Sequence, residues 1–368
     1  MREDPRHLLD STDALAEHDP SDMLGLVEGS ARQWREAADT VDSFSPPSHW
    51  RAVRRVILAG MGGSAIAGDI AAIYFSRRWP VSLSVIRDYA LPAWADKETL
   101  FIACSYSGNT EETLSAWHEA GERQLERAAI TTGGTLSMEA EEAGVPLLRL
   151  PTGYPPRAAL PSCLVVLFKL LSGVGAEGEM APGADATLRE MEAAAAVLDE
   201  LRGEYGRQVE VIENPAKELA LWLGTAWPVI YAPHYPLGPV AMRWRGQIGE
   251  NGKRVASGHA LPEMNHNEIV GWEMQGEIYP ATRVILMEDS GQGDRLSVRI
   301  DITAELLEKA GAAVRRLSTR GEELLVRMLS LIALGDYTSV YLATAWKVDP
   351  TPVKKIDYLK SKLAEAAK

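Results

Sequence analysis

The chain has few cysteines. Its 368 residues include only two, Cys104 and Cys163, and each lies within an apolar stretch. Two cysteines in such surroundings suggest neither a disulfide framework nor a cysteine-based metal site. We therefore expect both to be small buried hydrophobic residues.

Basic charge and long apolar runs are also scarce. The chain has 38 Lys and Arg against 51 Asp and Glu, a formal net charge of −13. Nucleic acids are held by net positive surfaces, so this balance argues against a nucleic-acid partner. No apolar run reaches the roughly 18 residues that a membrane span needs. Residues 1–20 are polar and acidic, unlike a secretory signal. We therefore expect a cytoplasmic protein without a membrane partner, in which any anionic ligand is held locally.

Short β-rich runs alternate with helix-length segments in two series along the chain. Such alternation predicts parallel sheets that are covered by helices on both faces. The expected strands are 55–59, 81–86, 100–104, 128–132 and 145–150 in the first series, and 228–232, 283–287 and 313–317 in the second. We therefore predict an α/β protein with two domains of similar plan.

The boundaries between these parts follow from composition. A Gly- and Ala-rich stretch, 173–186, interrupts the alternation, and a long apolar-periodic helix is expected over 322–346. The predicted parts are an N-terminal helical segment (1–48), a first domain (49–172), a partly helical connecting segment (173–212) and a second domain with a C-terminal helical tail (213–368).

The first expected strand ends in AGMGGSAIAGD, residues 59–69. Gly62 and Gly63 allow a sharp turn and a close approach of a ligand to the backbone. Ser64 follows at the start of a helix, where free N–H groups and the helix dipole favour an anion. The spacing is neither the dinucleotide-binding fingerprint nor a P-loop. The stretch therefore predicts a local anion site of another kind.

The third expected strand ends in CSYSGNTEET, residues 104–113. One interpretation is a helix cap, with Asn109 capping a helix that begins near Thr110 and Glu112 completing a capping box. However, Ser105, Ser107 and Thr110 offer more hydroxyls than one cap can use. Three rotatable donors above a helix N-terminus suit a phosphate that is bound without lysines.

MGGSAIAGD and SYSGNTEET together resemble the sugar isomerase (SIS) domain, in which two strand-to-helix loops clasp a sugar phosphate. Two such domains in one chain resemble the bifunctional phosphoglucose/phosphomannose isomerase family. The resemblance implies a metal-independent, cofactor-free aldose–ketose isomerase that links glucose 6-phosphate and/or mannose 6-phosphate to fructose 6-phosphate through a cis-enediol. It also implies these phosphate-binding residues: Gly62, Gly63, Ser64, Ser105, Ser107 and Thr110.

Further motifs match the family's catalytic residues. In GQIGENGK, residues 246–253, Glu250 corresponds to the base, although it could also be a solvated carboxylate before a helix-ending Gly252. A carboxylate in the last helical turn opposes the dipole, which favours the functional interpretation. In ALPEMNHNEIVGW, residues 260–272, His266 precedes an apolar helical run and corresponds to the ring-opening histidine. The family's histidine acts in the other subunit's site, which implies a homodimer. His234 matches no family motif.

Two more segments resemble the family. Arg157, at the entrance to an apolar helix, corresponds to the arginine that stabilises negative charge on the enediol. The lysine-rich C-terminus corresponds to the segment whose lysine contacts the substrate. We assign this lysine to Lys360, with Lys355 and Lys362 as alternatives, and we suspect that Thr351 lies near the C2 hydroxyl.

Three other interpretations remain open. The first is a regulatory SIS protein that binds a sugar phosphate without turnover, although no DNA-binding helix is evident in the first 50 residues. The second is an amino-sugar isomerase, which would normally carry a glutaminase domain. The third is a metal site at Glu263, His266 and Glu268, whose spacing depends on an uncertain helical register. We expect no metal.

Overall fold

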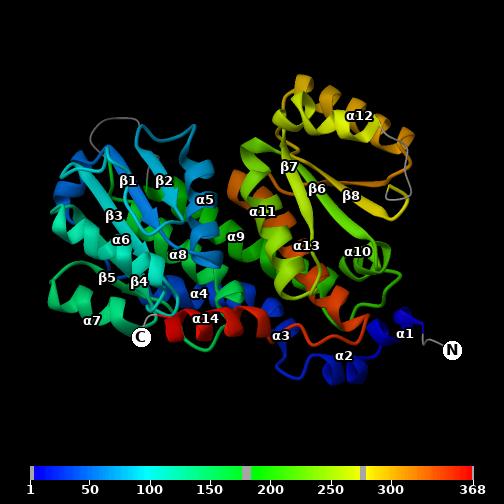
Figure 1. Cartoon of the computed structure of the whole chain (residues 1–368), viewed down its shortest axis with the longest axis horizontal. Coiled ribbons are helices and arrows are strands. Elements are labelled where there is room, and N and C mark those ends of the chain that lie inside the picture. Colours follow the sequence, from blue (N-terminus) through cyan, green and yellow to red (C-terminus); the bar gives the residue numbers. More distant parts are fainter. Residues whose placement is uncertain (1–3, 176–183, 274–278, 367–368) are drawn as a thin grey trace.

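Two parallel β-sheets lie side by side with helices between and around them (Figure 1). The computed structural model describes residues 4–175, 184–273 and 279–366. The first sheet has the strand order β2-β1-β3-β4-β5 and the second β7-β6-β8-β9, and neighbouring strands are parallel throughout. The strands are β1 (Arg55–Ala59), β2 (Ser82–Ile86), β3 (Thr99–Cys104), β4 (Glu126–Thr131), β5 (Leu147–Arg149), β6 (Trp227–Pro233), β7 (Ser257–Leu261), β8 (Thr282–Glu288) and β9 (Ala313–Ser318).

The predicted α/β class is confirmed, and each of the eight predicted strands is present. The prediction was incomplete at β7, which sequence analysis had not assigned to a strand. The predicted domain limits stay predictions. Part of the stretch 173–186 lies outside the described residues.

Helices cover both faces of the two sheets. In the first half of the chain they are α5 (Gly62–Phe75), α6 (Glu111–Glu122), α7 (Gly134–Glu142) and α8 (Leu160–Leu171), with 3-10 turns η1 (Ser48–Ala52) and η2 (Pro156–Ala158). In the second half they are α9 (Ala184–Tyr205), α10 (Pro215–Leu223), α11 (His234–Glu250), α12 (Asp294–Lys309), α13 (Leu324–Thr344) and α14 (Lys354–Ala366), with 3-10 turns η3 (Glu263–His266) and η4 (Glu268–Glu273).

One hydrophobic core extends from the first sheet to the second. Its centre is α13, which packs against α9, α10 and α11. By length and composition alone α13 could cross a membrane, but 94% of its most apolar window is buried inside the protein. Its apolar composition is therefore that of a central core helix.

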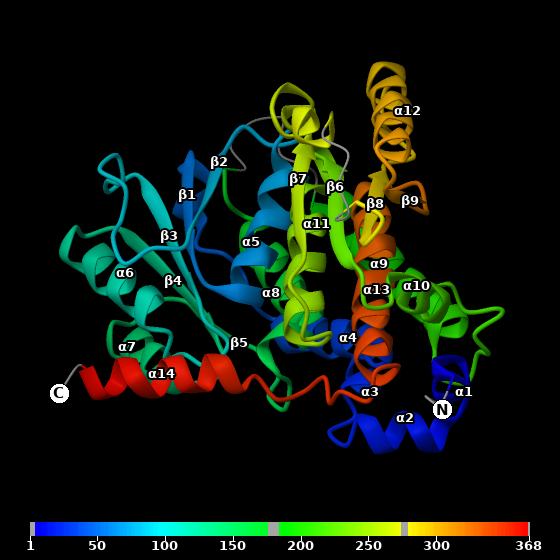
Figure 2. The same cartoon turned by 45° about the vertical axis from the view of Figure 1, so that its right-hand side comes forward.

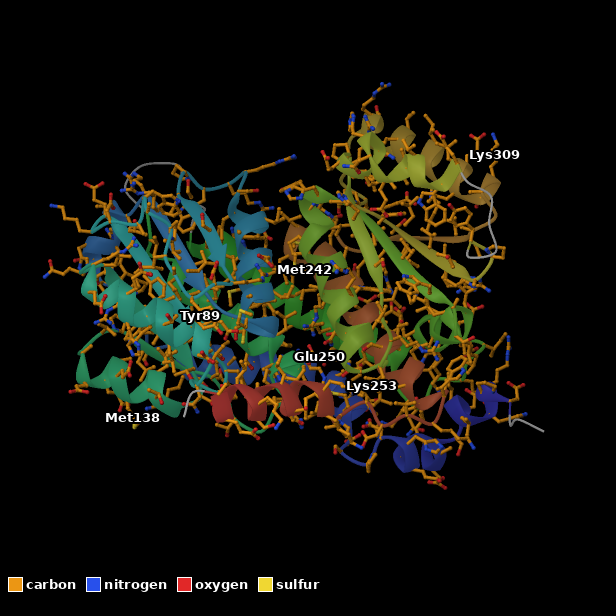
Figure 3. The ribbon with its side chains drawn as sticks, in the orientation of Figure 1. Tyr89, Met138, Met242, Glu250, Lys253 and Lys309 are labelled. Carbon is orange, nitrogen blue, oxygen red and sulfur yellow. The ribbon has the colours of Figure 1, made fainter. Side chains whose placement is uncertain are left out.

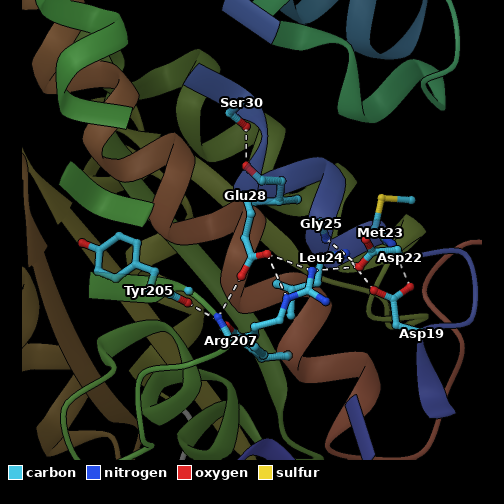
Figure 4. A network of polar contacts seen from close by, with 12 residues as sticks. Asp19, Asp22, Met23, Leu24, Gly25, Glu28, Ser30, Tyr205 and Arg207 are labelled. Atoms are coloured by element: carbon cyan, nitrogen blue, oxygen red, sulfur yellow. Dashed lines mark hydrogen bonds and ion pairs between the residues drawn. The ribbon is translucent and has the colours of Figure 1, made fainter. Parts of the chain in front are cut away.

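The N-terminal extension folds as four helices, α1 (Pro5–Asp10), α2 (Thr12–His18), α3 (Met23–Glu28) and α4 (Ser30–Val41). Polar contacts attach it to the end of α9 (Figure 4). The Arg207 Nε donates to Glu28 at 2.9 Å, and its Nη2 donates to Asp22 at 2.8 Å. The buried Asp19 accepts from the N–H groups of Met23 and Leu24. The extension is therefore held against the central helices.

The C-terminal helix α14 leaves the body of the molecule and runs beneath the first sheet (Figures 1 and 2). None of its described residues is buried. Its path crosses the region where the first sheet's strands end, so the chain's last segment returns to the side of the predicted phosphate loops.

Candidate active site

The two predicted phosphate loops lie side by side because β1 and β3 are neighbouring parallel strands, with Ala59 paired to Ala103. The first loop leads directly into α5 and the second into α6. Neither helix start has a side-chain cap among the described residues. Two helix N-termini with free N–H donors therefore face the same edge of the sheet, which suits an anion.

The hydroxyl groups of the second loop form a local cluster. Ser105 Oγ and Thr110 Oγ1 are 2.8 Å apart, and the Ser105 Oγ accepts from the Gly108 N–H at 3.1 Å. Ser105 and Ser64 are buried, whereas Ser107 is exposed. Both kinds of position retain hydroxyls that can turn toward a bound phosphate.

The capping interpretation of Asn109 was wrong for α6. The residue at the N-cap position is Thr110, and the Asn109 Oδ1 accepts instead from the Thr135 N–H at 3.0 Å, at the start of α7. Asn109 therefore joins the loop to the next helix and leaves the N-terminus of α6 open.

Arg157 joins the first loop to the second half of the chain. It lies in η2, which packs so closely on α5 that a Cβ on Gly63 would lie 2.7 Å from the Pro156 carbonyl oxygen. The Arg157 Nε donates to Asn251 Oδ1 at 2.6 Å, and its Nη1 lies 3.6 Å from Glu250 Oε2. Burial lowers the pKa of Arg157, and the nearby Glu250 opposes this shift.

Glu250 is the last residue of α11 and faces the space between the two halves of the molecule, directly above α14 (Figure 3). Its side chain is 34% exposed, while that of Arg157 is only 5% exposed. A partly exposed carboxylate next to a buried guanidinium can exchange a proton with a substrate while the arginine remains fixed.

Lys253 ends the turn after α11 and is a site residue that sequence analysis missed. It has the left-handed backbone conformation, with φ of 54°. Its Nζ donates to the Glu250 carbonyl and to the Pro350 carbonyl at 2.8 Å. Burial, followed by the charge of Arg157, lowers its pKa. Lys253 thus ties the end of α11 to the segment before α14.

A buried polar network supports Arg157 from behind. The Arg243 guanidinium donates to both carboxylate oxygens of Asp336 at 2.9 and 2.7 Å, and its Nη2 also donates to the Arg157 carbonyl at 3.0 Å. Asn251 in turn donates to Ser339 Oγ at 2.9 Å. The sequence signal that could have revealed this network is Asp336, a lone carboxylate within the apolar run of α13.

The segment before α14 closes the lower side of the site. The Arg157 Nη2 donates to the carbonyls of Pro350, at 3.0 Å, and Thr351, at 2.7 Å. The Thr351 Oγ1 is buried and has no hydrogen-bond partner among the described residues. A buried hydroxyl without a partner costs free energy, and a bound ligand could provide the missing contact. Lys355, Lys360 and Lys362 are exposed on α14, and the structure does not bring any of them against Glu250.

His266 lies far from Glu250 within one chain. It belongs to η3, after β7, and the apolar helical run expected there is replaced by the 3-10 turns η3 and η4. The end of β7 pairs with Pro233, the residue immediately before α11. Glu250 is at the opposite end of α11, a helix of 17 residues that spans about 25 Å. His266 is exposed.

A cavity of about 420 Å³ lies between α5, β2, α11 and β7. It is lined by His234, His259, Arg245 and Asp69, among others, and it contains none of the predicted site residues. His234 therefore belongs to a separate cavity at the start of α11.

Metal-ligating side chains do not gather in groups of three within the described residues. Cys104 and Cys163 are both buried, as expected. The candidate site brings together hydroxyls, backbone amides, a carboxylate, an arginine and a lysine.

Comparison with known proteins identifies the family. Residues 212–363 match the model of the bacterial phospho-glucose isomerase C-terminal SIS domain. The chain is 42% identical to a bifunctional phosphoglucose/phosphomannose isomerase of Caldicellulosiruptor bescii over 85% of this chain and 90% of that protein. The chain belongs to the bifunctional phosphoglucose/phosphomannose isomerase family.

A second relative agrees with this assignment, and a solved structure shares the fold. A bifunctional phosphoglucose/phosphomannose isomerase of Aquifex aeolicus is 34% identical over 94% of this chain and 99% of that protein. A glucose-6-phosphate isomerase-like protein of Thermus thermophilus has a similar structure, with a TM-score of 0.60 at 18% identity, covering 93% of this chain and 97% of that one. At that identity the structural likeness concerns the fold alone.

Proposed function

We propose that this member of the family interconverts fructose 6-phosphate with glucose 6-phosphate, mannose 6-phosphate or both, without a metal ion, through a cis-enediol. The observation that carries this proposal is the position of Arg157. It packs on the first phosphate loop and also contacts Glu250 and Thr351. A sugar phosphate held at the loops would extend from its phosphate toward a carboxylate and a guanidinium.

The proposed mechanism begins with the phosphate. The N–H groups of α5 and α6, with the hydroxyls of Ser64, Ser105, Ser107 and Thr110, hold it at the edge of the first sheet. Binding energy from this unreactive group orients the reacting carbons. Because the grip lies in one half of the chain and Glu250 in the other, the substrate would span the interface between them.

The proton transfer then uses Glu250 as the general base. From the open-chain aldose, Glu250 takes the proton of C2, the electron pair forms the C1–C2 double bond, and the carbonyl oxygen on C1 takes up a proton. Return of the proton to C1, with loss of the hydroxyl proton on O2, gives the ketose. Arg157 stabilises the negative charge that develops on the enediol oxygens.

The two aldoses can share this route. Glucose and mannose phosphates differ only at C2, and the enediol has lost the configuration of that carbon. The face on which C2 is reprotonated therefore decides the product. The buried Thr351 hydroxyl has no hydrogen-bond partner among the residues that the structure describes, and it lies next to Arg157. We assign Thr351 to the C2 side.

Ring opening requires a further group, which we assign to His266 of a second chain, with Lys360 assisting. Histidine can transfer a proton near neutral pH. Because His266 and Glu250 lie at opposite ends of α11, they cannot act on one substrate within a single chain. A homodimer in which each chain supplies His266 to the other's site resolves this separation.

One assay tests the central proposal. EDTA-treated protein is mixed with fructose 6-phosphate, and glucose 6-phosphate is followed with a coupled dehydrogenase. Glu250→Gln should lower kcat by about 10²- to 10⁴-fold, the usual contribution of a general base, while sugar-phosphate binding is retained. The matched control is Glu122→Gln, at the exposed last residue of α6. Full activity of Glu250→Gln would remove Glu250 from the mechanism.

A mixing experiment tests the shared site. Glu250→Gln and His266→Ala chains are each inactive alone, but a mixed dimer has one site with both groups intact. Random exchange of subunits should restore about a quarter of wild-type activity. No recovery in a mixture that exchanges subunits would place both residues in one chain's site.

The alternative function is a sugar-phosphate-binding regulatory protein without turnover. It would follow if wild-type protein binds fructose 6-phosphate but converts it to neither aldose phosphate. A cytoplasmic location, where such metabolites occur, is part of the same proposal.

A further inference from the structure

Two helices expose apolar stripes that the described residues of their own chain cover only in part. On α12 the stripe is Val298, Ile302 and Leu306, and on α14 it is Ile356, Leu359 and Leu363. These side chains are between 40% and 58% exposed. Residues three or four positions apart lie on one face of a helix, so each set forms a continuous strip.

The α12 stripe borders a groove of about 310 Å³. The opposite wall is the segment that carries His266: Asn265 donates to Thr303 Oγ1 at 2.9 Å and accepts from Arg299 Nη1 at 3.2 Å. Ile269 of η4 also lines the groove. Whatever fills this groove therefore packs beside His266.

The α14 stripe needs a partner of its own. None of the described residues of α14 is buried, and a helix of 13 residues is marginally stable when isolated in water. Figures 1 and 2 place α12 and α14 at opposite ends of the molecule, so α14 cannot cover the α12 of its own chain. Among the described residues none packs over the α14 stripe, so a second molecule is the partner that we consider.

We infer that in the homodimer the apolar face of α14 from one chain docks into the α12 groove of the other, next to the His266 that serves the first chain's site. The choice of a second copy as occupant rests on the proposed sharing of His266. Glu250, Pro350 and the start of α14 lie together through Lys253, so a His266 delivered to that site brings its own α12 groove alongside α14.

The two apolar surfaces match in length. Each stripe is about 11 to 12 Å long at the rise of an α-helix. Helix α14 carries four lysines and two carboxylates, and α12 carries four carboxylates and three basic residues. Asp301 and Glu305 flank one side of the α12 stripe, but they pair with Arg316 and Lys309, and the groove itself is lined by Arg295 and Arg299. The contact that we infer is therefore made by the apolar side chains. A two-fold axis repeats the contact, which doubles the buried apolar area.

Cross-linking between single-cysteine variants tests this pairing directly. The native Cys104 and Cys163 are buried and so do not compete. A mixture of Ile302→Cys and Leu359→Cys chains, treated with a short bis-maleimide, should give a covalent dimer on a denaturing gel. The matched control replaces Ile302→Cys with Ile212→Cys, at a site 80% exposed and outside both stripes. The control mixture should give little covalent dimer.

A second measurement uses sedimentation. Ile302→Glu and Leu359→Glu should each weaken dimerisation at least tenfold, whereas Ile212→Glu should not. Combining Ile302→Lys with Leu359→Glu should restore part of the dimer through opposite charges.

The outcomes separate this inference from the proposed function. If the cross-link fails but the Glu250→Gln and His266→Ala mixture recovers activity, the helix pairing is wrong and the shared site stands. If the cross-link forms in a protein that does not turn over hexose phosphates, the pairing stands and the proposed function fails. A wild-type chain that remains monomeric would overturn the helix pairing and the shared site, whereas the isomerase activity is tested separately by Glu250→Gln.

Discussion

Replacing Arg157 by lysine keeps the charge at the centre of the site but removes its geometry. The guanidinium makes three hydrogen bonds, to Asn251 and to the carbonyls of Pro350 and Thr351, and it makes an ion pair with Glu250. A lysine ammonium at the same position cannot keep these directions at once, because it is a single point donor on a flexible stem.

The expected cost follows from the contacts that are lost. Hydrogen bonds involving a charged group contribute about 1.5 to 3 kcal/mol each, so losing one or two should lower the free energy of unfolding by about 3 kcal/mol. Removing a donor that stabilises an oxyanion lowers kcat by about 10²- to 10³-fold. The phosphate loops are unchanged, so inhibition by inorganic phosphate should be unchanged.

The assay compares wild type, Arg157→Lys and Arg149→Lys by coupled kinetics and urea unfolding. Arg149 forms an exposed ion pair with Glu141, and its replacement should change the unfolding free energy by no more than about 1 kcal/mol. If Arg157→Lys folds normally and keeps the wild-type kcat, the assignment of Arg157 to the developing negative charge is refuted. A parallel loss of phosphate inhibition would instead show that the replacement disturbs the first loop.

Two other replacements probe the same region. Gly63→Ala places a Cβ 2.7 Å from the Pro156 carbonyl oxygen, so kcat should fall and stability should decrease by about 1 to 3 kcal/mol, whereas Gly203→Ala, whose Cβ meets no atom within 4 Å, should not destabilise the protein. Lys253 has a pKa below 10.5 in the folded chain, so as pH rises toward 10.5 the unfolded chain keeps this proton longer and wild type should gain stability relative to Lys253→Met. Urea unfolding of both proteins over a pH series measures this, and a constant difference would contradict it.

The strands and loops that sequence analysis predicted are those with strong local signals. β1 and β3 are apolar, rich in strand-forming residues, and end in glycine- and hydroxyl-containing turns. β7 has the sequence SGHAL, without a β-branched or aromatic residue. It is a strand because β6 pairs with it, and Gly258 allows this approach, since a Cβ there would lie 2.2 Å from the Ile230 carbonyl oxygen. That determinant lies in another part of the chain.

The same distinction holds in the site. Motifs placed Ser105 and Glu250 in plausible local settings, but Asn109 bonds to Thr135, 26 positions away. The support for Arg157 comes from Arg243, whose carboxylate partner Asp336 is 93 positions further along the chain. Pairings at such separations follow from tertiary packing and leave no local pattern.

The central position of α13 has a consequence for the order in which the protein can fold. Synthesis proceeds from the N-terminus, so residues 1–323 are made before the helix against which α9, α10 and α11 pack. Until then those helices expose the apolar faces that α13 will cover. The nascent chain can complete its first sheet early, but the shared core can close only after residues 324–344 have been made. The interval before α13 has been made is therefore when the chain most needs protection from aggregation.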